Sequence, residues 1–172
     1  MTLRLAAFTA GGQRGDLVTI SFDHQTFAPA VSATAANSGL HCDLFRGVFN
    51  HTADIKGSAD NSMTMSHVAL PANPPGSYGM QFRGYIDVPQ TGIYSFFLTS
   101  DDGSVLRIAD RLVVDNDGGH SSKEKSGQIA LAKGLHVFAL DYMDLGGGGS
   151  LNLQYSVGDT APQLVPDSWL KY

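Results

Sequence analysis

Two adjacent carboxylates, Asp101 and Asp102, stand at the end of an apolar run and directly before Gly103. Carboxylate oxygens suit hard cations, and calcium takes about six to eight such ligands. Neighbouring side chains of a regular strand point to opposite faces, so an ordinary strand would keep this pair apart. We therefore expect the chain to turn here, by a feature such as a cis peptide bond, and to form a metal-assisted binding site.

Two carboxylates do not complete a calcium shell, and the sequence offers further oxygens nearby. Asp144 lies just before the four glycines Gly146–Gly149, and glycine lets a backbone approach a ligand closely. Asn116 and Asp117 are additional candidates. The predicted metal ligands are Asp101, Asp102 and Asp144, and Gly146 and Gly147 join them as predicted ligand-binding residues.

The same residues also allow a purely structural interpretation. Asp-Gly between two apolar runs is a strong hairpin signal, in which Asp101 would accept nearby backbone N–H groups. A catalytic pair is disfavoured, because glycosidase carboxylates face each other across the substrate at about 5–9.5 Å. The sequence has no nucleophile elbow, phosphate loop or dinucleotide fingerprint, so we expect no catalysis. His120 is expected to be an exposed loop residue and Trp169 to belong to the core.

Composition excludes several classes of function. The chain has 172 residues and a formal net charge of −5, and its 11 Lys and Arg residues are dispersed. Nucleic-acid binding needs a basic surface, so it is disfavoured. No apolar run approaches the roughly 20 residues that a membrane helix needs. The single cysteine, Cys42, excludes an internal disulfide and is expected to be a small buried residue.

The elements that would position these residues are short strands. Twenty glycines and seven prolines separate short apolar runs, which is typical of an all-β sandwich or barrel. Alternation is clearest in residues 93–100, where Tyr94, Phe96 and Leu98 share one face, and this strand should be central. The other predicted strands cover residues 3–8, 18–27, 80–88, 105–108, 111–116, 128–131, 135–142 and 151–155, with a polar loop at 117–126.

A change in composition divides the chain. Residues Pro29–Gly39 are small and polar, which is typical of a linker. The residues before it are too few to bury a core alone. We therefore predict that residues 1–38 are the end strands of a preceding module plus a linker, or extra strands on the sandwich, and that residues 39–172 form the main domain.

Several motifs in order resemble the anthrax protective antigen-type domain. They are Gly39–Gly47, Phe82–Pro89, Gly92–Phe96, Thr99–Ser104, Leu106–Ile108, Val113–His120, Leu131–His136, and Tyr142 with the glycine-rich loop after it. Arg46 replaces an acidic residue that is usual in the family's opening strand. The resemblance implies an antiparallel β-sandwich with jelly-roll-like packing.

The resemblance also implies a function. Members of this family are appended to bacterial glycosidases, toxins and fungal adhesins, and some bind sugars through calcium held by the adjacent aspartates. We therefore expect a non-catalytic carbohydrate-binding or substrate-positioning module of a larger extracytoplasmic bacterial glycosidase. The alternatives are a structural spacer that packs on a catalytic domain and a protein-binding adhesin module.

Overall fold

The computed structural model describes residues 1–22, 25–35, 37–74 and 76–172. Strands dominate these residues, and two single 3₁₀ turns, Thr52–Asp54 and Asp167–Trp169, complete the regular structure. The strands are β1 (Thr2–Leu5), β2 (Val18–Ser21), β3 (Leu40–Arg46), β4 (Asn61–Met65), β5 (Tyr78–Val88), β6 (Gly92–Asp101), β7 (Ser104–Ile108), β8 (Arg111–Asn116), β9 (Lys123–Leu131), β10 (Gly134–Asp144), β11 (Ser150–Val157), β12 (Gln163–Leu164) and β13 (Leu170–Lys171).

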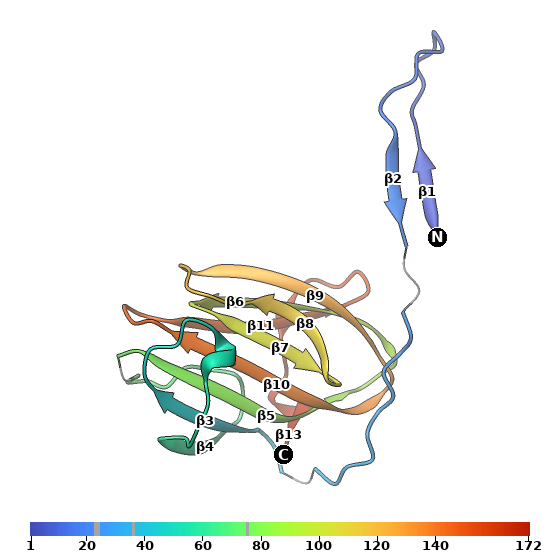
Figure 1. The fold of residues 1–172 in the computed structure, drawn as a ribbon. Helices are drawn as coiled ribbons and strands as arrows, with labels where there is room; N and C mark the ends of the chain where they lie inside the picture. The colour runs from blue at the N-terminus through green and yellow to red at the C-terminus, as the bar shows by residue number, and fades with distance from the viewer. Residues whose placement is uncertain (23–24, 36, 75) are drawn as a thin grey trace.

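The strands from β3 onward form two antiparallel sheets. One runs in the order β4-β3-β5-β10-β7-β8 with β13 also paired to β5, and the other runs β12-β11-β6-β9. The two sheets pack as a sandwich, while β1 and β2 form a separate hairpin that projects away from it (Figure 1). The predicted all-β antiparallel sandwich is confirmed, and β6 lies inside its sheet as the alternation indicated.

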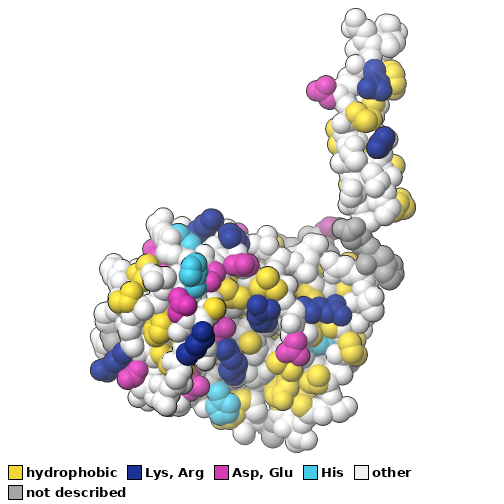
Figure 2. All heavy atoms as spheres, in the orientation of Figure 1, with side chains coloured by type: hydrophobic (Ala, Val, Ile, Leu, Met, Phe, Trp, Pro, Cys, Tyr) yellow, Lys and Arg dark blue, Asp and Glu magenta, His cyan; other side chains and the backbone are white. Residues whose placement is uncertain are grey.

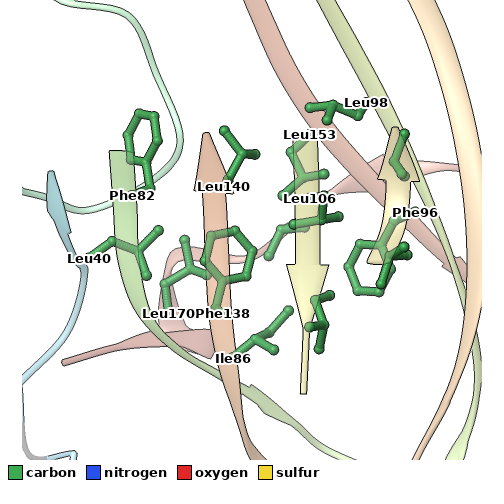
Figure 3. Packing of buried hydrophobic residues seen from close by; sticks show 14 of the residues in the cluster. Leu40, Phe82, Ile86, Phe96, Leu98, Leu106, Phe138, Leu140, Leu153 and Leu170 are labelled. Carbon is green, nitrogen blue, oxygen red and sulfur yellow. The ribbon is translucent and has the colours of Figure 1, made fainter. Parts of the chain in front are cut away.

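Alternating side chains from both sheets fill the space between them. Tyr94, Phe96 and Leu98 of β6 are completely buried, as are Phe138 and Leu140 of β10. Figure 3 shows leucine and phenylalanine side chains from several strands gathered between the layers. Trp169 lies at the margin of this core, partly buried, with its ring centroid 4.5 Å from that of Tyr155.

Several strands differ from the sequence expectation: β1 and β2 are shorter than predicted, β12 and β13 were not predicted, and β9 and β4 show the physical reason most clearly. The predicted loop at residues 117–126 is wrong in its second half, because β9 begins at Lys123. Among the strands that the structure describes, β9 is the edge of its sheet and has β6 as its neighbour, so its first residues expose charged side chains that look like a loop in sequence. β4 was not predicted, and it is also an edge strand with exposed polar residues.

The segment between the hairpin and the sandwich is fastened to the sandwich by its backbone. Ala28 donates an N–H to Ala130 and accepts one from Ala132, and its side chain is buried. Further along, Val31 bonds to Leu135. Within the described residues, no helix is long and apolar enough to cross a membrane.

Cys42 supplies a test of the core packing. The residue is completely buried, and burial, followed by the charge of Asp43, raises the thiol pKa from 9.0 to about 12. Only the thiolate reacts readily, so we expect the folded protein to react with an aromatic disulfide reagent at pH 8 far more slowly than the denatured protein.

The same pKa shift predicts a dependence of stability on pH. Above pH 9 the unfolded chain loses the Cys42 proton while the folded chain keeps it, so stability falls as pH rises toward 12. Between pH 8 and 10.5 the loss from this group should be about 2 kcal/mol. Urea unfolding of the protein and of Cys42→Ala measures the difference, and equal slopes in the two proteins would contradict the burial.

Candidate functional site

The turn that carries the carboxylate pair passes from one sheet to the other. β6 pairs with β11 and β9 and ends at Asp101, while β7 pairs with β10 and β8 and begins at Ser104. The hairpin prediction for Asp102-Gly103 is therefore wrong, because the strands on its two sides do not pair with each other. The peptide bond between Asp101 and Asp102 is cis, the redirection that the sequence led us to expect.

Both carboxylates turn toward the loop between β8 and β9. The backbone N–H of Ser122 donates to Oδ2 of Asp101 at 3.0 Å, and that of His120 donates to Oδ1 of Asp102 at 2.8 Å. Gly103 makes this approach possible, since a Cβ there would lie 2.8 Å from the backbone nitrogen of Gly118. The two side chains therefore face one region, as a shared site requires.

Asp102 also connects this loop to the glycine-rich loop. Its second oxygen, Oδ2, accepts the backbone N–H of Leu145 at 2.8 Å. The residue is only 9% exposed, and each of its carboxylate oxygens accepts one backbone N–H group. Asp102 is consequently the residue that positions both loops around the turn.

Asp144 lies beneath the glycine-rich loop. It is 2% exposed, and its Oδ1 accepts the N–H of Gly146. The hydroxyl of Tyr142 donates to the backbone oxygen of Asp101 and lies 3.4 Å from Oδ2 of Asp144, so it links the two carboxylate-bearing segments. A Cβ at Gly149 would lie 2.3 Å from that hydroxyl, which explains the glycine.

The two additional candidates, Asp117 and Asn116, lie in different surroundings. Asp117 is engaged away from the pair, because its oxygens contact the backbone N–H of Thr52 at 2.8 Å and Nδ1 of His51 at 3.3 Å. Asn116 is completely buried, and its side-chain amide donates to Ser100 and to the backbone of Lys123. Among the described residues nothing donates to its Oδ1, which leaves one buried oxygen without a partner.

The sequence contains little sign of the burial of His120 and Tyr142. His120 was expected to be an exposed loop residue, but it is partly buried, with Nε2 and Nδ1 each 2.9 Å from a backbone oxygen. Tyr142 is completely buried, and desolvation raises the pKa of its hydroxyl well above the usual value. Only the period-two position of Tyr142 in a strand signalled its burial, and nothing in the sequence signalled the backbone donors.

The donor chemistry of the site fits a hard cation. The oxygens at the turn are carboxylate and backbone oxygens, and a carboxylate oxygen that accepts one N–H retains a further lone pair. In the part of the chain that the structure describes, no three His, Cys, Asp or Glu side chains group closely enough to hold a metal by themselves. An ion here would need Asp101 and Asp102 together with neutral oxygens.

The site is an open surface at one end of the sandwich. The glycines of the 146–149 loop are exposed, and Asp101 is partly exposed. A separate hollow of about 210 Å³ lies elsewhere, lined mainly by aliphatic side chains, among them Val68, Leu153 and Leu170. The carboxylate end therefore suits a ligand that lies on the surface, with most of its atoms in water.

Comparisons with solved structures identify the same fold in several settings. An anti-sigma factor domain-containing protein from Clostridium clariflavum is 24% identical, with a TM-score of 0.68 over 78% of this chain and 47% of its own. The chain thus spans about half the length of that protein. At these identities the likeness establishes the fold alone.

Two further structures consist almost entirely of this fold. The PA14 sugar-binding domain from an RTX adhesin is 16% identical, with a TM-score of 0.67 over 80% of this chain and 99% of that one. The epithelial adhesin 9 A domain from Candida glabrata, solved with Galβ1-3GlcNAc, is 14% identical, with a TM-score of 0.67 over 86% and 96% of the two chains.

Sequence comparison gives the family. The search of curated protein sequences found no match. The family model of the PA14 domain matches residues 23–169, which include both sheets except β13, the Asp101–Asp102 turn and the glycine-rich loop. The chain therefore belongs to the PA14 domain family, as its resemblance to the anthrax protective antigen-type domain predicted.

Proposed function

We propose that the chain is a non-catalytic carbohydrate-binding module of a larger extracytoplasmic protein, and that calcium at Asp101 and Asp102 helps to hold the sugar. One observation carries the proposal: two adjacent carboxylates turn toward a single loop at the exposed end of the sandwich. Solved relatives of the fold include a domain described as sugar-binding and one in complex with a disaccharide.

The roles of the other residues follow from their places. Asp144 lies under the glycine-rich loop, and the Tyr142 hydroxyl links its carboxylate to the backbone of Asp101. Gly146 and Gly147 are exposed, so their backbone groups are free of side-chain cover and can approach a sugar ring. Calcium supplies a positive charge that sugar hydroxyls can coordinate, and the carboxylates fix its position.

The larger protein is proposed to be a bacterial glycosidase, following the resemblance noted in the sequence. In that setting the module positions substrate for a separate catalytic domain and performs no hydrolysis itself. An adhesin module is the second candidate, and it is favoured by the adhesins among the solved relatives. A purely structural spacer would leave the carboxylate end without a ligand.

Calcium titration tests the metal. Chelator-treated protein should melt at a higher temperature when calcium is added, because a ligand at one hundred times its dissociation constant stabilises a fold by about 2.7 kcal/mol. For a chain of this length that corresponds to roughly 5–10 °C. Asp101→Ala should abolish the shift, whereas Asp87→Ala, an exposed carboxylate on β5, should retain it.

The sugar is tested on the same proteins. Calorimetry measures the binding of Galβ1-3GlcNAc and a panel of monosaccharides, once in calcium and once in chelator. We expect at least one of these sugars to bind in calcium and not in chelator. No melting shift at millimolar calcium would reject the ion. A shift that persists in Asp101→Ala would place the ion elsewhere, and calcium binding without any sugar binding would favour the spacer.

A further inference from the structure

The hairpin formed by β1 and β2 has one apolar face. Its register pairs Leu3 with Ile20 and Leu5 with Val18, and cross-strand partners lie on the same side of a ribbon. Thr2, Arg4, Thr19 and Ser21 occupy the opposite side. Mutual backbone hydrogen bonds between Met1 and Phe22 extend the ladder by one pair and add two more apolar side chains to the first face.

This apolar face is open to water. Leu3, Leu5, Val18 and Ile20 are 40%, 47%, 55% and 39% exposed, and no residue from 1 to 22 is buried. Figure 2 shows hydrophobic side chains along the projecting hairpin, clear of the sandwich. Large contiguous patches of exposed apolar side chains on a soluble protein mark interaction sites.

A two-stranded ribbon of this kind is not stable alone. Isolated hairpins are marginal in water, and a third strand or a packing layer is needed. Both outer edges of this ribbon also lack a neighbouring strand, because β1 and β2 pair only with each other among the described strands. The hairpin is therefore incomplete in two directions: across its apolar face and along its edges.

The form of this incompleteness indicates the partner. A second copy of the hairpin could cover the apolar face but would leave all the edges unpaired. A larger β-sandwich would complete the hairpin in both directions. Its facing sheet would cover the apolar face, and its neighbouring strands would pair with the edges. The PA14 fold also occupies only 47% of the anti-sigma factor domain-containing protein, so it occurs beside other segments in one chain.

We propose that residues 1–22 are the last two strands of a second β-sandwich, completed by chain that precedes them in the intact protein. Leu3, Leu5, Val18 and Ile20 face the core of that module. The segment from Ala28 onward, fastened to β9 and β10, then connects two adjacent folded modules. The proposal does not depend on any ligand at Asp101 and Asp102.

Experiments on the 172-residue chain give the first test. Backbone amides of residues 1–22 should exchange hydrogen at nearly the rates of an unfolded peptide, while β5, β6 and β10 stay protected. Ile20→Asp should leave the melting temperature unchanged, as should Thr19→Asp on the polar face. A lower melting temperature for Ile20→Asp alone would mean that the hairpin packs on its own sandwich, and would overturn the proposal.

The second test extends the chain upstream along its gene by about one domain, on the order of 100 residues. Exchange at the amides of Leu3 and Ile20 should then slow by at least about 100-fold. In that longer protein, Ile20→Asp should unfold the added module and leave the sandwich transition in place, with Thr19→Asp as the control.

Three further results would overturn the inference. The first is a reading frame that starts at Met1. The second is an extended protein in which hydrogen exchange at Leu3 and Ile20 is unchanged. The third is a 172-residue chain that sediments as a dimer, which Ile20→Asp dissociates. The last result would assign the apolar face to a second copy of this chain.

Discussion

Replacing Gly127 with alanine should cost about 3 kcal/mol or more of folding free energy, because the added methyl group meets a backbone carbonyl. Gly127 lies in β9, and a Cβ built on it would be 1.7 Å from the oxygen of Val113 in β8. β8 and β9 belong to different sheets, so this glycine sets how closely the two layers approach at that edge. The methyl group can be accommodated only if the layers separate.

The melting temperature should report the loss directly, with a fall of roughly 6–12 °C for a chain of this length. Gly92→Ala is the matched control in β6 of the same sheet. Its nearest atom would be Cγ1 of Val157 at 3.5 Å, an ordinary contact, so its effect should stay below about 1 kcal/mol. Equal melting temperatures for the two variants would show that the sheets do not approach closely at Gly127.

The buried strands were predictable from the sequence because their side chains alternate. In β6, for example, Phe96 and Leu98 are two residues apart and lie on the same face, as the alternation of a strand requires. Two edge strands were not predicted correctly, since β9 begins with exposed charged residues and β4 is polar. At an edge, backbone pairing holds a strand whose side chains carry no signal.

The residues of the candidate site and the redirection of the chain at Asp101 and Asp102 were predictable from the sequence, but the contacts of the carboxylates were not. The adjacent aspartates and the glycine loop were visible in the sequence, but the turn was open to interpretation as a hairpin. The turn connects two sheets because its flanking strands pair with distant strands: β6 with β11, and β7 with β10. The backbone N–H groups of His120 and Leu145, which hold Asp102, carry no residue-specific signature at all.

Removing the Asp102 carboxylate should have the largest effect at the site. Asp102→Ala leaves the N–H groups of His120 and Leu145 without their acceptor, and hydrogen bonds to a charged group contribute about 1.5–3 kcal/mol each. Allowing for water that reaches the loosened loops, we expect a loss of about 2–4 kcal/mol in the chelated protein. Asp101→Ala removes one such bond at a partly exposed carboxylate, and should cost about 1 kcal/mol.

Asp102→Asn separates charge from shape. The amide keeps an oxygen that can accept one of the two N–H groups, but its NH₂ group faces the other donor. Stability should therefore decrease in the order wild type, Asp102→Asn, Asp102→Ala, as measured by urea unfolding in chelator. If Asp102→Ala were no less stable than Asp101→Ala, the bridge between the two loops would be excluded.

The ligand response of these variants should follow the same residue. If calcium and sugar bind at the turn, Asp102→Ala should weaken sugar binding by at least about 100-fold, or about 2.7 kcal/mol, because it removes a ligand and frees both loops. Asp102→Asn should hold the two loops partly in position, yet it should not respond to calcium, since it lacks the second negative charge. Sugar binding that is retained in Asp102→Asn and lost in Asp102→Ala would instead mean that loop position, and not the metal, controls recognition.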